Sequence, residues 1–177
     1  MRVIAGSLGG RTFDAPKGFK THPMSDKTRG ALFSMLGGLD GLTVLDAFAG
    51  SGALSFEAVS RGATCAIAIE SDRTAQKVIA RNIKMLGLDD SVKLISASAN
   101  AWLQTNPDAL FDLVLCDPPY NDLQPNLLQR LARHVKPEGL LVLSWPADAA
   151  PPAFDGLNQL EHRRHGDASL VFYRHTG

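Results

Sequence analysis

The 177-residue sequence has few cysteines, no long apolar run and no cluster of metal ligands, and each absence narrows its function. No apolar stretch approaches the roughly 20 residues of a membrane-spanning helix, so we expect no transmembrane segment. The N-terminal apolar stretch is too short for a signal peptide. Cys65 and Cys116 both fall in expected strands, which favours buried reduced thiols and a cytoplasmic protein. Without a cluster of Cys and His ligands, we expect no metal.

The chain also has no net excess of positive or negative charge, but its charges are distributed unevenly along the sequence. Residues 1–36 carry six cations and two anions, whereas residues 37–177 carry 12 cations and 16 anions. A basic N-terminal segment on a mildly acidic body favours a polyanionic partner, although a solvated surface without a partner explains the charge equally well.

The first part of the chain predicts a small extension. Residues 2–5 and 11–13 are short β-type segments around a glycine-rich turn, which is typical of a hairpin. Residues 15–23 indicate an extended linker with two prolines. A helix is expected from Ser25 or Asp26 to Leu36.

From residue 42 onward, strand and helix patterns alternate, which predicts an α/β fold with a parallel sheet covered by helices on both faces. At the end, residues 157–164 and 169–174 predict an antiparallel hairpin at the sheet edge. The expected strands are 43–46, 65–69, 92–96, 111–116 and 139–144, and the expected helices are about 52–61, 72–86, 99–104 and 123–134.

Residues 44–57 (VLDAFAGSGALSFE) predict a strand, a tight glycine turn and a helix start. Gly50 and Gly52 allow a ligand to approach the backbone at the carboxyl end of a strand, where open α/β sheets bind ligands. A dinucleotide site prefers glycine or alanine three residues beyond the second glycine, where this chain has Ser55. Asp46 would repel a pyrophosphate but attract a cationic amine. The turn therefore indicates S-adenosylmethionine rather than NAD.

Glu70 ends the next strand, where an acid can bind both hydroxyls of an adenosyl ribose. Alternatively, Asp46 and Glu70 only cap the elements that follow them. Residues after the third strand would lie beside the adenine, whereas Trp102 and Leu103 are expected to pack the helix. The expected cofactor contacts are Asp46, Phe48, Gly50, Gly52, Glu70, Ser71, Ser98 and Ala99.

The stretch Asp117-Pro118-Pro119-Tyr120 follows an apolar strand pattern and is the expected catalytic segment. Two prolines make the exit from the strand stiff and extended. The Asp117 carboxylate and the Pro118 carbonyl can accept both hydrogens of an exocyclic amine, which favours a pyramidal nitrogen with an available lone pair. Tyr120 can stack on the base. A proline-rich loop without function is the alternative.

These motifs together resemble the RsmD-type methyltransferases, which transfer methyl from S-adenosylmethionine to a guanine N2 of 16S ribosomal RNA. The resemblance implies a class I Rossmann-like fold with a mostly parallel seven-stranded sheet and an antiparallel last strand. Residues 1–38 would form a hairpin and helix extension, and residues 39–177 the core, within one compact domain. The matching segments are residues 2–6, Gly10 and Arg11, residues 25–36, residues 45–52, residues 117–120, and Gly166 with Asp167.

The resemblance also implies that residues 1–36 help to bind RNA and cover the cofactor. The partner would be the small ribosomal subunit, assembled or assembling, with the target base turned out of its stack and the enzyme acting as a monomer. The chain departs from the family pattern at residues 22–24 (HPM), where relatives usually carry Arg-Pro-Thr, so an RNA or cofactor contact there is expected to be weaker. It also departs at Ser98, where relatives usually carry Asp, so weaker or backbone-mediated adenine recognition is expected. The expected RNA contacts are Arg2, Arg11, Lys17, Lys20 and Arg29.

Other functions remain compatible with parts of this pattern. A DNA adenine-N6 or protein-glutamine methyltransferase would use similar chemistry, although the chain has no spare length for a DNA-reading domain. A non-catalytic RNA-binding assembly factor would need none of Asp46, Glu70 or Asp117. A nicotinamide-dependent oxidoreductase is disfavoured by Asp46 and Ser55.

Overall fold

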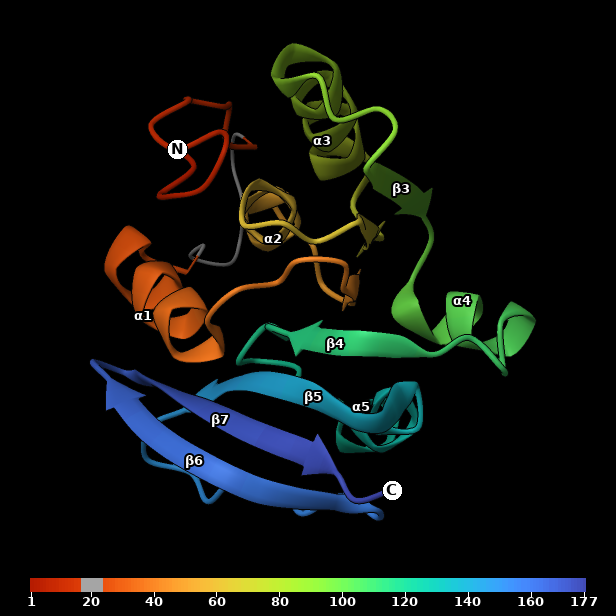
Figure 1. The fold of residues 1–177 in the computed structure, drawn as a ribbon. Helices are drawn as coiled ribbons and strands as arrows, with labels where there is room; N and C mark the ends of the chain where they lie inside the picture. The colour runs from red at the N-terminus through yellow and green to blue at the C-terminus, as the bar shows by residue number, and fades with distance from the viewer. Residues whose placement is uncertain (17–23) are drawn as a thin grey trace.

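A computed structural model describes residues 1–16 and 24–177 as a seven-stranded sheet with helices on both faces (Figure 1). The order across the sheet is β3-β2-β1-β4-β5-β7-β6. The strands are β1 (Thr43–Asp46), β2 (Cys65–Glu70), β3 (Val92–Ser96), β4 (Phe111–Cys116), β5 (Val135–Pro146), β6 (Leu157–His165) and β7 (Ala168–His175). The helices are α1 (Asp26–Leu36), α2 (Ala53–Ser60), α3 (Arg73–Leu86), α4 (Ala99–Thr105) and α5 (Pro125–Ala132).

The sheet direction confirms the predicted fold class. Strands β1 to β5 pair in parallel, whereas β7 runs antiparallel to both β5 and β6. The predicted C-terminal hairpin is present, but its second strand is inserted between β5 and β6, so only β6 lies at the edge. Strand β5 is also longer than the expected 139–144, since it runs from Val135 to Pro146. It includes Glu138, which has a positive φ of 64°.

Two apolar cores fill the space between the sheet and its helices. On the face that α1 and α2 cover, Phe33 and Phe56 are fully buried. On the face that α4 and α5 cover, Trp102, Leu103 and Leu128 are buried. Trp102 and Leu103 therefore pack the helix, as predicted. Both cysteines are free thiols, Cys116 buried and Cys65 partly so.

Helix starts and ends match their local sequence signals. The Ser25 side chain accepts a hydrogen bond from the Thr28 backbone N–H at the start of α1, and Gly37 ends that helix with a φ of 78°. Asp72 caps α3 in the same way.

Across residues 1–16 and 24–177, no helix combines the length and apolar character needed to cross a membrane.

The predicted N-terminal hairpin is reduced to one isolated bridge between Arg2 and Thr12. Backbone hydrogen bonds join its two arms, from Val3 N–H to the Arg11 carbonyl, from Gly10 N–H to the Val3 carbonyl and from Phe13 N–H to the Met1 carbonyl. The loop is therefore closed by its own backbone pairing, and contacts with α2 add to it.

Candidate functional site

Three carboxylates meet at the carboxyl ends of adjacent strands. Asp46 ends β1, Glu70 ends β2, and Asp117 directly follows β4. Because β2, β1 and β4 are neighbours in parallel, their ends lie together at one edge of the sheet. Burial is the main cause of the raised pKa of Asp46, and the charges of Asp117 and Glu70 raise it further. Such a cluster attracts a cation.

Asp46 is fully buried and has one unsatisfied oxygen. Its Oδ2 accepts a hydrogen bond from Ser55 Oγ at 2.7 Å, whereas Oδ1 has no hydrogen-bond partner among the described residues. Burial raises the pKa of Asp46 to about 7, and the Ser55 hydrogen bond partly opposes that rise. A buried acceptor without a donor fits the ammonium group of a bound S-adenosylmethionine.

The glycine turn next to Asp46 has a backbone conformation that favours glycine. Gly50 and Gly52 both have positive φ, 58° and 82°. A Cβ at Gly52 would lie 2.6 Å from the Phe56 ring, so only glycine fits there. Phe48 is partly buried and packs against the core on the face that α4 and α5 cover.

Glu70 holds the turn in place. Its Oε2 accepts a hydrogen bond from Gly50 N–H, and its Oε1 accepts one from Asp72 N–H, both at 2.7 Å. The capping role that was the alternative for Glu70 is therefore present. Each carboxylate oxygen can accept more than one hydrogen bond, so binding of a ribose hydroxyl stays a prediction.

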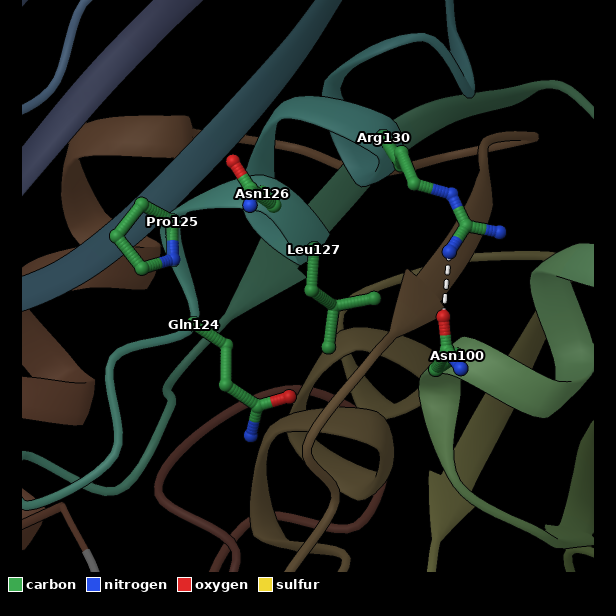
Figure 2. A pocket seen from close by; sticks show the side chains of 6 residues that line it. All are labelled: Asn100, Gln124, Pro125, Asn126, Leu127 and Arg130. Carbon is green, nitrogen blue, oxygen red and sulfur yellow. Dashed lines mark hydrogen bonds between the residues drawn. The ribbon is translucent and has the colours of Figure 1, made fainter.

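The residues expected near the adenine lie where α4 begins. Ser98 caps α4 by accepting a hydrogen bond from Ala101 N–H at 3.2 Å, and the buried Ala99 follows it. Ser71 lies exposed after β2. Beside this helix start, a hollow of about 320 Å³ opens toward α5, where Arg130 donates a hydrogen bond to the Asn100 side chain (Figure 2). The hollow is lined by Asn100, Gln124, Pro125, Asn126, Leu127 and Arg130.

The segment after β4 lies against a buried serine of the next strand. Ser144 on β5 is buried and lies 2.8 Å from the Tyr120 hydroxyl, and either hydroxyl can donate in this pair. Burial raises the pKa of Asp117 to about 6, and the nearby Ser144 hydroxyl partly opposes that rise. The Tyr120 side chain remains 41% exposed, which leaves surface for a base.

With this geometry established, comparison with known proteins identifies the family. The family described as "Conserved hypothetical protein 95" matches residues 1–174. The chain belongs to this family. Within it, the ribosomal RNA small subunit methyltransferase D of Escherichia coli is 30% identical over 151 residues, covering 85% of this chain and 71% of its own. The protein of the same name from Haemophilus influenzae is 27% identical and covers 98% and 93%. The RsmD-type resemblance is confirmed.

Solved structures agree with this family assignment. A structure from Escherichia coli has a TM-score of 0.88 at 26% identity and covers 99% of this chain and 98% of that one. The Thermus thermophilus protein TTHA0928 has a TM-score of 0.81 at 28% identity, with 97% and 98% covered. The structure of SMU.776 with S-adenosylhomocysteine, 16% identical with a TM-score of 0.63, shows the shared Rossmann-like fold. The family and the fold support S-adenosylmethionine as the cofactor.

Two of the basic residues predicted to contact RNA, Arg29 and Arg11, use their guanidinium groups inside the protein. Arg29 is fully buried, where it donates to the Arg2 carbonyl at 2.7 Å and pairs with Asp26 at 2.9 Å. The prediction that Arg29 contacts RNA is therefore wrong, because its guanidinium is used inside the protein. Arg11 donates to the carbonyls of Met85 and Leu86 at the end of α3, so its guanidinium is also occupied.

Arg2 remains a candidate RNA contact, since its side chain is 65% exposed and, among residues 1–16 and 24–177, its one ion pair is with Asp26 at 3.3 Å. Lys17, Lys20 and the departures at His22 and Pro23 lie outside the described residues. Met24, the third residue of that departure, is partly buried against the core on the face that α1 and α2 cover.

The sequence interpretation missed the contacts that hold the N-terminal segment on α2. Glu57 is fully buried and accepts hydrogen bonds from Ile4 N–H at 2.7 Å, Ala5 N–H at 3.1 Å and Arg61 Nε at 2.7 Å. Ser60 Oγ donates to the Ala5 carbonyl at 2.6 Å. An acid in the middle of an otherwise apolar helix was the available signal for Glu57.

Proposed function

We propose that this chain is an S-adenosylmethionine-dependent methyltransferase that modifies a guanine exocyclic N2 amine in small-subunit ribosomal RNA. The observation that carries the proposal is that Asp117, which follows β4, lies at the same edge of the sheet as Asp46 and Glu70, which end β1 and β2. The names of the family's curated members support ribosomal RNA as the substrate. We propose that it acts as a monomer, without a metal, on an assembled or assembling subunit.

The cofactor site is assigned to the ends of β1, β2 and β3. When bound, S-adenosylmethionine supplies a methyl group on a cationic sulfonium. Asp46 would accept from the ammonium, Glu70 would hold the ribose hydroxyls, and Gly50 and Gly52 would let the backbone approach. Ser98 and Ala99, at the start of α4, would lie near the adenine, with Ser71 and Phe48 flanking the site.

The amine site is assigned to the segment after β4. The Asp117 carboxylate and the Pro118 carbonyl would accept the two N–H groups of the guanine amine, so that its lone pair points at the methyl carbon. A bound S-adenosylmethionine would supply the methyl group and would leave with the electrons of its carbon–sulfur bond. The Asp117 carboxylate, which would accept one amine N–H, would take the proton that the amine loses. Positioning and charge stabilisation supply the acceleration. Tyr120 would hold the base plane.

The charges of the site fit this reaction. Three carboxylates near a sulfonium and an ammonium are stabilised by the two positive charges, whereas they would repel a pyrophosphate. Within the described residues, no group of His, Cys, Asp or Glu is arranged to hold a metal ion.

The proposal is tested with labelled cofactor and small subunits from a strain that lacks the methylation. Transfer to subunit RNA by the wild-type protein, but not by Asp117→Asn, is expected. Transfer to duplex DNA or protein in place of subunits would favour the other amino methyltransferases. Absence of both cofactor binding in calorimetry and transfer would favour a non-catalytic assembly factor.

A further inference from the structure

The C-terminal hairpin of β6 and β7 differs in charge from the rest of the core. Residues 157–177 carry three arginines and two acids, whereas residues 37–156 carry nine cations and 14 anions. The basic asymmetry of the sequence is therefore not confined to the N-terminal segment. A second positive element on an acidic body indicates a contact with the same polyanion.

The turn of this hairpin lies at the catalytic edge of the sheet. Since β7 runs antiparallel to β5, its first residues pair with the last residues of β5, Ala168 with Pro146 and Ser169 with Trp145. In Figure 1 the β6–β7 turn lies on the left, the side to which the arrowheads of β4 and β5 point. The hairpin tip is therefore on the same side as the segment that follows β4.

One arginine of the hairpin lies in the cross-sheet row of Asp117. On β4 and β5, Cys116 pairs with Leu143, so the next residue, Asp117, lies opposite Ser144. Across β7, Ser144 pairs with Leu170. Leu170 in turn pairs with Arg163 on β6. Neighbouring strands lie about 4.8 Å apart, which places the Arg163 backbone about 15 Å from that of Asp117. Paired residues share a face, and Leu170 packs in the core under α1. Arg163 therefore lies on the face that α1 covers.

The Arg163 side chain is available for a ligand. It is 59% exposed, and its Nε donates to Glu161 at 3.1 Å, its one hydrogen bond among the described residues. An exposed ion pair contributes about 0–1 kcal/mol, so exchange for a phosphate costs little. A guanidinium can bind two phosphate oxygens at once.

We propose that Arg163 docks the substrate RNA by binding the phosphate backbone of nucleotides that flank the target base. This inference rests on the proposed function. Arg2 pairs with Asp26 at the start of α1, and Arg163 lies on the face that α1 covers, so the two ends of the chain each present an exposed arginine on this side of the sheet.

The test compares Arg163→Gln with Arg174→Gln. Arg174 is an exposed arginine of the same hairpin, and it lies an even number of residues from Leu170 and thus on the same face. It pairs with Leu140 rather than with a residue at the catalytic edge. Binding to protein-free 16S ribosomal RNA is measured over a range of salt concentrations. Arg163→Gln should lower the slope of log K against log salt by about 1 and weaken binding several-fold, whereas Arg174→Gln should match the wild type.

Equal slopes for the two variants would overturn the inference. A loss that appears on assembled subunits but not on protein-free RNA would also overturn it, because the contact would then be with a ribosomal protein. The proposed function fails separately, if the wild-type protein binds this RNA but transfers no methyl group to it or to subunits. Calorimetry with S-adenosylmethionine should give the same affinity for all three proteins, which excludes a general folding defect.

Discussion

Removal of the Ser144 hydroxyl should change the pH at which the enzyme becomes active. Ser144→Ala deletes the hydroxyl that pairs with Tyr120 and lowers the pKa of Asp117, while keeping a buried β5 side chain. Asp117 must be ionised to accept the amine hydrogens. Its pKa is already raised to about 6 by burial, and the Ser144 hydrogen bond is what lowers it. Without that bond, the pKa rises further, so activity is lost as the pH falls through a higher value.

The size of this effect follows from the energy of the hydrogen bond. A hydrogen bond to a charged group contributes about 1.5–3 kcal/mol, and 1.36 kcal/mol corresponds to one pH unit, so a shift of at least about one unit is expected. At pH 7, a carboxyl group with a pKa of 6 is about 90% ionised, whereas one with a pKa of 7 is about half ionised. The variant should therefore lose about half of its activity at pH 7 and recover it near pH 9.

The assay is kcat/KM for methyl transfer from pH 5 to pH 9, because this parameter reports ionisations of the unliganded enzyme. Ser169→Ala is the matched control, since Ser169 is a buried β7 serine whose hydroxyl has no partner among the described residues. Ser144→Thr, which keeps a hydroxyl, should restore the wild-type profile. An unchanged acid limb in Ser144→Ala, or the same change in Ser169→Ala, would refute the effect of Ser144 on the pKa of Asp117.

Three further results are expected. Asp117→Asn should abolish transfer with cofactor affinity nearly intact by calorimetry; comparable losses in both would assign Asp117 to the cofactor instead. Ser55→Ala removes the hydrogen bond that lowers the pKa of Asp46, so this pKa should rise further. Cofactor binding should therefore weaken at pH 7 and recover at higher pH. A pH-independent affinity would contradict the Asp46 contact. Glu57→Ala leaves buried partners without their acceptor and should lower the free energy of unfolding by about 3 kcal/mol, with faster proteolysis of residues 1–16. Stability equal to the wild type would contradict the anchoring role.

Much of the fold could be predicted because its signals are local. Apolar strand runs, the glycine turn and helix caps such as Ser25 each depend on a few neighbouring residues. The same holds for the three acids, because a residue that ends a parallel strand must lie at the common edge of the sheet. The insertion of β7 between β5 and β6 could not be predicted, since hairpin residues do not specify which strand they join.

Contacts between distant segments were missed for the same reason. Ser144 lies 24 residues from Tyr120, and nothing in its own strand marks it. Arg29 has the charge expected of an RNA contact, and only its burial shows that it is used inside the protein. The number of basic residues in a sequence segment is therefore a weak predictor of a basic surface, because a long side chain can turn inward and donate to backbone carbonyls. The position of an acid at the end of a parallel strand is a stronger predictor of where its side chain lies.

Mass spectrometry of digested small-subunit ribosomal RNA tests the central claim most directly. RNA from a methylation-deficient strain is treated with the wild-type protein and labelled S-adenosylmethionine, and each modified nucleotide is mapped, with Asp117→Asn as the inactive control. The account predicts one labelled guanosine that carries its methyl group on N2, present with the wild-type protein and absent with Asp117→Asn. A label on another base or another atom, or equal labelling by the two proteins, would contradict it.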